Sequence, residues 1–270
     1  MAIRRRARFI RWLTGRYIRR IDIAHAPVEK MRKRLDQLGR LARPARHVTT
    51  EEKTIAGVHA EWYRPEQPTP GKLLLYLHGG AYTLGSCDSH RKLVTHMAKE
   101  GNIEAVMPEY RLAPEHPFPA GLDDAVAVYK ALLDSGYKAA DIVISGDSAG
   151  GGLSVATMLQ LRHEGLPLPG AAVLISPFLD VSASGESMKT RADRDPWFRP
   201  DELEVVVRYY CPGEDVRNPL LSPVFANVAG LPPTLIHVGD DEILLSDCLL
   251  YTSPSPRDNQ PHLVCRLLLE

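Results

Sequence analysis

The 270-residue chain has few cysteines, no long apolar run and no net charge, and each absence excludes a class of protein. Four cysteines without regular spacing do not form a disulfide framework. No apolar run approaches the roughly 20 residues that a membrane-spanning helix needs. The N-terminal segment has no apolar stretch typical of a secretory signal, so we expect a cytoplasmic location. With 44% hydrophobic residues the chain can form a sizeable core, which excludes disorder as its main state.

The zero net charge is the average of two unlike parts. Residues 1–46 hold 15 of the 33 lysine and arginine residues and only three acids, a net charge of +12, so the remainder carries −12. The helical spacing of Met31, Leu35, Leu38 and Leu41 favours soluble helices whose arginine-rich faces lie in water. Binding to anionic lipid or nucleic acid, or a transit peptide, are the alternatives. We expect no nucleic-acid partner and at most weak contact with a membrane surface.

From residue 71 onward, short apolar runs alternate with helical stretches. Near-continuous apolar strands separated by helices are typical of a parallel sheet covered on both faces, so the sequence predicts an α/β protein. Ligands of such sheets bind at the carboxyl ends of the strands. The predicted strands are residues 72–77, 103–107, 142–145, 171–175 and 234–238, and the predicted helices are residues 93–99, 121–133, 149–163 and 200–210.

The strand that ends at Ser145 is followed by Gly146-Asp147-Ser148-Ala149-Gly150, a G-x-S-x-G sequence with a helix after it. In this context the serine lies on a sharp, strained turn that lifts its hydroxyl above the sheet. The flanking glycines let the strand and the helix pass without a Cβ clash. The pattern therefore indicates a nucleophilic serine.

Two other strand ends carry related features. His78-Gly79-Gly80-Ala81-Tyr82 follows the first apolar strand, and its two glycines free backbone N–H groups for an oxyanion hole. We interpret His78 as a hydrogen-bonding brace of this loop and not as a base. Gly239-Asp240-Asp241-Glu242-Ile243 follows the last apolar strand, where an acid matches the chain order serine, acid, histidine of a catalytic triad.

Together these motifs resemble those of the hormone-sensitive-lipase-like esterases, a group within the α/β-hydrolase fold. The resemblance runs from about residue 25 to Asp247 and rests on HGGAY at residues 78–82, YRLAPEHPFPA at 110–120, GDSAGG at 146–151 and GDDEIL at 239–244. It implies an α/β-hydrolase domain over residues 47–247, with a mostly parallel sheet and helices on both faces. It also implies a helical cap made by residues 1–46 and by an insertion at about residues 181–210.

The resemblance further implies an activity and its site residues. The activity is hydrolysis of short-chain acyl esters of small molecules through an acyl-serine intermediate, with no metal and no cofactor. Ser148 is the nucleophile, Asp241 is the acid that orients the histidine, and the N–H groups of Gly79, Gly80 and Ala149 form the oxyanion hole. Ala81 stands where the family often has a third glycine, and its methyl group is tolerated if φ is negative.

The histidine that this mechanism requires is not where the family places it, roughly thirty residues beyond the acid. Only His262 follows Asp241. Residues 248–258, CLLYTSPSPRD, and residues 262–269, HLVCRLLL, read in order and in frame as the translation of a transposase-type sequencing adapter around a barcode. We therefore expect a non-native tail at residues 248–270, with the final strand and closing helix of the fold missing and His262 irrelevant. A genuine divergent tail is the alternative.

On this interpretation the chain is inactive as given and poorly folded, because strand 234–238 is left as an exposed apolar edge. Pro254, Pro256 and Pro261 remove backbone donors that a replacement strand would need. Two other functions stay open. One is a ligand-binding protein that lost the histidine, and the other is a hydrolase of the same family acting on a lactone or an acetylated compound.

Overall fold

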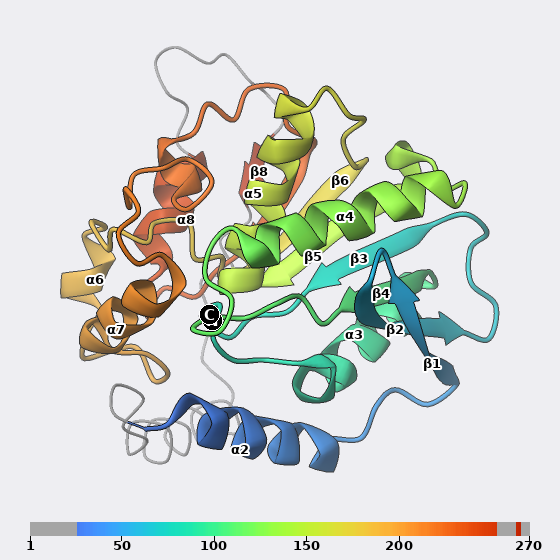
Figure 1. Ribbon diagram of the computed structural model, residues 1–270, viewed down its shortest axis with the longest axis horizontal. Helices are drawn as coiled ribbons and strands as arrows, with labels where there is room; N and C mark the ends of the chain where they lie inside the picture. Colours follow the sequence, from blue (N-terminus) through green and yellow to red (C-terminus); the bar gives the residue numbers. More distant parts are fainter. Residues whose placement is uncertain (1–25, 253–262, 266–270) are drawn as a thin grey trace.

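An eight-stranded sheet forms the centre of the computed structural model, which describes residues 26–252 and 263–265 (Figure 1). The strand order is β1-β2-β4-β3-β5-β6-β7-β8. β2 runs antiparallel to β1 and β4, and the other neighbouring pairs are parallel. The α/β class and the mostly parallel sheet expected from the sequence are confirmed.

The elements follow one another as strands and helices along the chain. The strands are β1 (Val48–Ile55), β2 (Val58–Pro65), β3 (Leu73–Leu77), β4 (Glu104–Pro108), β5 (Ile142–Asp147), β6 (Ala171–Ile175), β7 (Thr234–His237) and β8 (Leu263–Cys265). The helices are α2 (Val28–Leu41), α3 (Cys87–Gly101), α4 (Ala120–Asp134), α5 (Ala149–His163), α6 (Ser187–Thr190), α7 (Pro200–Tyr210) and α8 (Leu245–Thr252), with 3-10 turns η1 (Ala139–Asp141) and η2 (Pro223–Phe225).

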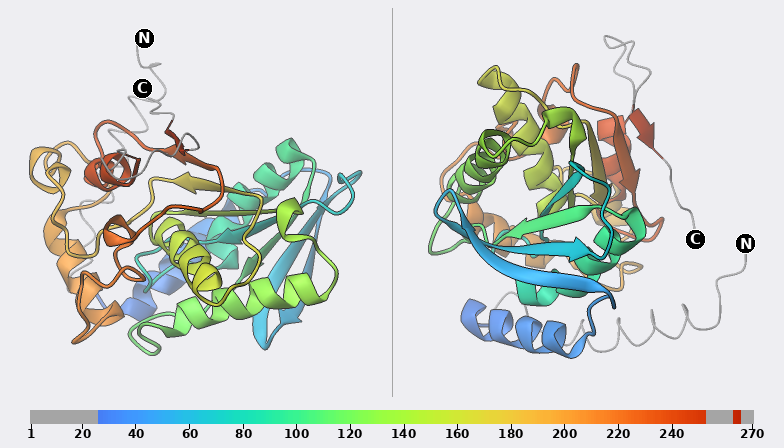
Figure 2. Two further views of the ribbon diagram at one scale, coloured as in Figure 1. Left: turned by 90° about the horizontal axis from the view of Figure 1, so that it is seen from above. Right: turned by 90° about the vertical axis from the view of Figure 1, so that its right-hand side faces the viewer.

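Helices cover both faces of the twisted sheet (Figure 2). The side chains of β3 accordingly alternate between two apolar cores, one on each face. Leu73, Leu75 and Leu77 pack in the large core that contains α4 and α5. Leu74 and Tyr76 point the other way and pack with α3 in a second core. Because successive side chains of a strand face opposite sides, a strand covered on both faces is apolar throughout.

Each of the nine strands and helices predicted from residue 71 onward is present, with ends that differ by a few residues. The largest difference is α3, which begins at Cys87 and not at residue 93. Ser86 caps this helix, because its hydroxyl accepts the N–H of Ser89 at 3.1 Å. The extra turns follow from this cap, which the apolar spacing of the later turns does not reveal.

The antiparallel pair β1 and β2 was not predicted. The two strands form a hairpin whose turn contains Ala56 and Gly57, with φ of 51° and 83°. Such left-handed turns match the twist of a hairpin. β1 is largely exposed and rich in threonine and glutamate, so the sequence carries no apolar run there.

The expectation that the final strand and closing helix are missing is wrong for this structure. α8 continues through the first part of the supposed tail, and Cys248 and Tyr251 are buried in the core. β8 pairs in parallel with β7, so β7 is not an exposed edge. Pro254, Pro256 and Pro261 do not prevent this pairing, because each lies outside the three residues of β8.

α2 forms in the basic N-terminal segment, as the spacing of Met31, Leu35, Leu38 and Leu41 predicts. It packs on α3 and lies along one side of the molecule, away from the sheet (Figure 1). Residues 1–25 lie outside the described residues, so membrane-surface contact by this segment stays a prediction. Among the helices of residues 26–252, none is long and apolar enough to cross a bilayer.

Candidate active site

Ser148 occupies the turn between β5 and α5. Its φ of 49° and ψ of −120° lie in the left-handed region, where a residue with a side chain is strained by about 1–2 kcal/mol. A Cβ atom on Gly146 would lie 2.4 Å from the backbone of Gly150, and one on Gly150 would lie 2.0 Å from the carbonyl oxygen of Leu77. At Gly146 the strand β5 lies too close to α5 for a side chain, and at Gly150 the helix lies too close to the end of β3, so both positions require glycine, as the G-x-S-x-G sequence predicts.

The N–H group of Gly79 is already engaged. It donates to Oδ1 of Asp147 at 2.9 Å, and the same oxygen accepts the hydroxyl of Tyr76 at 2.7 Å. A Cβ atom on Gly79 would lie 2.2 Å from Oδ2 of Asp147. The glycine is therefore required for close approach to the carboxylate. The structure does not support Gly79 as an oxyanion donor, because its N–H holds the loop to the turn of the nucleophile.

Three other N–H groups are available beside Ser148. Those of Gly80, Ala81 and Ala149 donate to no acceptor among the residues that the structure describes. Gly80 and Ala81 line the same cavity as Ser148, and Ala149 is the first residue of α5, where the helix dipole favours negative charge. The φ of Ala81 is 55°, so the condition of a negative φ, under which we expected its methyl group to be tolerated, is not met. The chain tolerates alanine here in a conformation that glycine adopts without strain.

His78 is fully buried behind this loop. Its Nδ1 lies 2.9 Å from the carbonyl oxygen of Gly79, and its ring stacks on Tyr110 at a centroid distance of 4.4 Å. Burial and the neighbouring His90 lower the pKa of His78 to about 3, so the ring is neutral and its Nδ1–H donates to Gly79. This is the geometry of a loop brace, the role expected from the sequence.

His90, near the start of α3, is a site residue that the sequence analysis missed. It lines the cavity, and its Nε2 lies 3.4 Å from Oδ2 of Asp147. Burial alone would lower the pKa of His90, but the hydrogen bond and negative charge of Asp147 raise it overall. Burial likewise opposes ionisation of Asp147, yet His90, Tyr76 and the N–H of Gly79 lower its pKa. The only signal in the sequence was a histidine shortly after the HGGAY loop.

Asp241 lies in the loop after β7 and forms an ion pair with Arg194. Its neighbour Asp240 lies 3.5 Å from the guanidinium of Arg191 and accepts the Nε–H of that arginine on its backbone oxygen at 2.8 Å. Asp241 is not among the residues that line the cavity with Ser148. His262 lies outside the described residues, and within the described part no histidine is hydrogen-bonded to the hydroxyl of Ser148.

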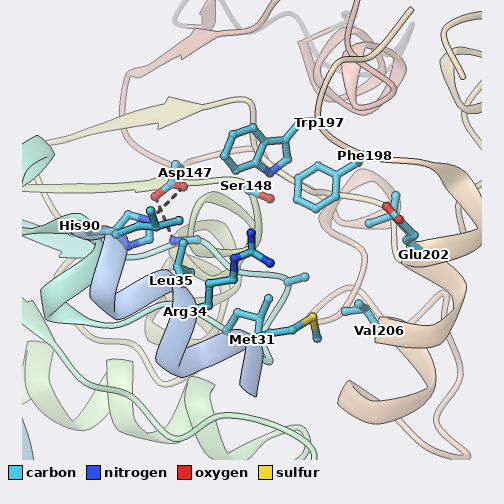
Figure 3. A pocket seen from close by; sticks show the side chains of 16 residues that line it. Met31, Arg34, Leu35, His90, Asp147, Ser148, Trp197, Phe198, Glu202 and Val206 are labelled. Carbon is cyan, nitrogen blue, oxygen red and sulfur yellow. Dashed lines mark hydrogen bonds and ion pairs between the residues drawn. The ribbon is translucent and has the colours of Figure 1, made fainter. Parts of the chain in front are cut away.

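The cavity beside Ser148 has a volume of about 260 Å³ and is lined almost entirely by apolar groups (Figure 3). Its walls are formed by α2, the HGGAY loop, the start of α3, the turn of the nucleophile, and α7 with the residues that lead into it. The apolar side chains are Met31, Leu35, Leu38, Leu84, Trp197, Phe198, Leu203 and Val206. Among the described residues, no cluster of histidine, cysteine or acidic side chains has the arrangement of a metal site.

Known proteins share both the sequence and the fold. A family profile described as the alpha/beta hydrolase fold matches residues 74–255. The chain is 44% identical over 194 residues to an acetyl-hydrolase of Streptomyces hygroscopicus, covering 72% of this chain and 64% of that protein. It is 38% identical over 215 residues to an esterase of Acinetobacter venetianus, covering 79% of this chain and 70% of that protein. The chain thus spans less than two thirds of the acetyl-hydrolase.

Solved structures match over nearly the whole chain. A crystal structure of EstE5 soaked with ethyl alcohol superimposes with a TM-score of 0.90 at 39% identity, covering 97% of this chain and 86% of that one. An esterase from the bacterial hormone-sensitive lipase family superimposes with a TM-score of 0.89 at 34% identity, covering 100% of this chain and 89% of that one. The chain therefore belongs to the bacterial hormone-sensitive lipase family of the alpha/beta hydrolase fold.

Proposed function

We propose that this protein is a serine carboxylesterase that hydrolyses short-chain acyl esters through an acyl-serine intermediate. The observation that carries the proposal is the strained Ser148 in the wall of an apolar cavity, beside three N–H groups without an acceptor among the described residues. The similarity to an esterase and an acetyl-hydrolase supports the choice of acetyl and other short acyl groups.

In the proposed reaction, Oγ of Ser148 attacks the carbonyl carbon of the ester, and the carbonyl oxygen takes up the negative charge. The N–H groups of Gly80, Ala81 and Ala149 donate to that oxygen, which stabilises the tetrahedral intermediate. The bond to the alcohol then breaks, and the alcohol leaves with the proton that serine lost. Water attacks the acyl-serine by the same route and releases the carboxylic acid.

A base must hold the serine proton between these steps, and we propose an imidazole oriented by Asp241. The ion pair between Asp241 and Arg194 is compatible with this role if the imidazole shares the carboxylate. We further propose that α2 and residues 181–210 form the cap over the acyl pocket, because α2 and residues 197–206 of this segment line the cavity together with Ser148. These assignments rest on the resemblance and on the position of each residue in the fold.

We also propose that residues 248–270 are adapter-derived, so that the chain as given lacks the native histidine and is inactive. The order and frame of CLLYTSPSPRD and HLVCRLLL support this proposal. Burial of Cys248 and Tyr251 and the pairing of β8 do not require a native origin, since an open apolar edge accepts short segments of many sequences. Sequencing of the source DNA past codon 247 tests it. A source gene that encodes the same 23 residues would overturn the proposal.

A non-catalytic ligand-binding protein is the second candidate, and the pairing of Asp241 with Arg194 favours it. An arginine on the Asp241 carboxylate competes with an imidazole for the same oxygens, which would weaken the orienting role of the acid. Hydrolysis separates the two functions, because a binding protein holds an ester in the cavity without cleaving it.

The test of the esterase uses 4-nitrophenyl butyrate with the protein encoded by the complete source gene and, in parallel, the 270-residue chain. We expect turnover by the former, and a Ser148→Ala variant should lose about 10⁶-fold in kcat. Ser154→Ala is the matched control, since this serine lies within α5 and bonds the carbonyl of Gly150 away from the cavity. If Ser148→Ala kept more than a few per cent of the rate, Ser148 would not be the nucleophile.

A further inference from the structure

Among the described residues, Arg34 is the one arginine or lysine that lines the apolar cavity. The face of α2 that lines it contains Met31, Arg34, Leu35 and Leu38, which follow the spacing of one helix face. Three of the four are apolar, as expected for the wall of an acyl pocket. Figure 3 shows the guanidinium of Arg34 pointing from α2 toward Ser148 and the rings of Trp197 and Phe198.

The other charged side chains of the cavity already have partners. Asp147 is held by Tyr76, the N–H of Gly79 and His90. Glu202 has a side chain only 3% exposed and bonds the guanidinium of Arg199 at 2.9 Å. Neither carboxylate therefore has a free oxygen pair to offer to a second cation in the cavity.

Arg34 itself has no ion pair with any residue that the structure describes. Its neighbour Arg32 provides the contrast, since it bonds both carboxylate oxygens of Glu115 and the carbonyl oxygens of Thr83 and Ala113. Arg32 therefore holds α2 in place, whereas Arg34 points toward the site of reaction and pairs with no acidic side chain among the described residues. Arg34 is an exposed residue that also lines the cavity, so its guanidinium stays hydrated and is accessible to an anion that a ligand brings.

We propose that Arg34 recognises a carboxylate carried by the ester, so that the substrate is a half-ester of a dicarboxylic acid or a similar ester with one free carboxylate. This inference rests on the proposed esterase function. The planar guanidinium binds a carboxylate through two parallel hydrogen bonds. One carboxylate neutralises one guanidinium, whereas a doubly charged phosphate would leave excess negative charge beside the apolar wall of the cavity.

Two ligands of equal chain length test the inference: monoethyl adipate, which carries a terminal carboxylate, and ethyl hexanoate, which ends in a methyl group. Their affinities are measured in the full 270-residue chain with Ser148→Ala, which prevents turnover, through the fluorescence of Trp197 in the cavity wall. A Trp197→Phe variant identifies the signal. The comparison is repeated with Arg34→Gln, Arg34→Lys and the control Lys33→Gln, which removes a charge from the same helix outside the cavity.

We expect monoethyl adipate to bind about tenfold more tightly than ethyl hexanoate, as one charge-assisted pair at a partly exposed site provides. Arg34→Gln should abolish the preference, Arg34→Lys should retain part of it, and Lys33→Gln should leave it unchanged. Equal affinities for the two esters in the starting protein, or the same preference in Arg34→Gln, would overturn the inference. Failure of the esterase proposal is separate, since it appears as absent hydrolysis of 4-nitrophenyl butyrate by the protein of the complete gene.

Discussion

Residues in the left-handed region gather around the cavity, although none of the three central ones is glycine. Ala81, Tyr82 and Ser148 have φ values of 55°, 59° and 49°. Tight packing holds these conformations, because the ring of Tyr82 stacks on Tyr210 at 3.7 Å and its carbonyl accepts the N–H of Ala113 at 2.9 Å. The strain costs of order 1 kcal/mol for each residue. In the resulting loop the N–H groups of Gly80 and Ala81 have no acceptor among the described residues.

Ala81 is the position where this strain is easiest to relieve. We expect Ala81→Gly to raise the free energy of unfolding by about 0.5–1 kcal/mol, since relief of the left-handed strain exceeds the extra entropy of glycine in the unfolded chain. Urea unfolding measures the difference. Ala131→Gly within α4 is the control and should lower stability by about 1 kcal/mol, because that residue is helical. A loss of stability in both variants would contradict the account of Ala81.

Asp247 is a buried acid with an unusual protonation state. It is fully buried, and its Oδ2 accepts the N–H groups of Leu179 and Asp180 at 3.1 Å each. Burial, with the nearby charge of Asp180, raises the pKa of Asp247 from 3.8 to about 8. The folded protein therefore keeps this proton at neutral pH, while the unfolded chain releases it near pH 4.

This difference predicts how stability depends on pH. Between about pH 4 and pH 8 the folded state binds the proton of Asp247 and the unfolded state does not, so the stabilisation is complete below pH 4 and falls as pH rises to 8. Asp247→Asn should reduce that fall, so its stability relative to the unmodified protein increases from pH 5 to pH 8. Urea unfolding at both values measures it, with Asp134→Asn at the exposed end of α4 as control. A constant difference between the two pH values would show that Asp247 is ionised in the fold.

At the scale of elements, α2 is attached to the active-site region by a few specific contacts. Arg32 binds Glu115 and the carbonyl oxygen of Thr83, which connects α2 both to the loop after HGGAY and to the YRLAPEHPFPA segment. Arg40 binds Asp88 at the start of α3 with its Nε at 2.7 Å. A Cβ atom on Gly39 would lie 2.4 Å from the backbone oxygen of Asp88. Close approach and ion pairs, more than a buried apolar face, hold this wall of the cavity in place.

We expect Arg32→Gln to loosen α2 and open the cavity, because it removes hydrogen bonds to a carboxylate and two carbonyl groups. Limited proteolysis should cut within residues 26–46 at least fivefold faster, and binding of ethyl hexanoate should weaken several-fold. Lys33→Gln lies on the same helix without these contacts and should change neither. Unchanged cleavage of Arg32→Gln would mean that the Arg40 and Gly39 contacts alone hold the helix.

At the scale of the whole molecule, the C-terminal segment decides how the sheet ends. β7 contributes four residues, and its outer side is covered only by the three residues of β8 within the described part of the chain. An uncovered apolar strand recruits other chains. We therefore expect this segment to limit self-association, whatever its origin.

A chain shortened to end at Thr252 tests this role, since it keeps α8 and loses β8. We expect it to self-associate at concentrations where the 270-residue chain stays monomeric, as measured by size-exclusion chromatography with light scattering. A shortened chain ending at residue 265 retains β8 and serves as the control. If the form ending at Thr252 remained monomeric with the same thermal midpoint, β8 would not protect the sheet edge.

The sequence by itself determined the α/β class, the alternation of strands and helices and the turn of Ser148, because these depend on local patterns. Apolar runs with helical stretches between them predict the parallel sheet, and Gly146 and Gly150 predict a turn that only residues without Cβ allow. The hairpin of β1 and β2 was not predicted, because β1 is largely exposed and its sequence lacks the apolar run that indicates a strand.

Only the tertiary structure decided which groups meet. The bond from Gly79 to Asp147, the pair of His90 with Asp147 and the ion pair of Asp241 with Arg194 each join residues more than 40 positions apart in the chain. Arg34 faces the cavity because α2 docks on α3, which no local pattern specifies. The distances between side chains that are remote in the sequence are set by how the helices and strands pack. The sequence therefore indicates candidate site residues, and the packing determines which of them lie together.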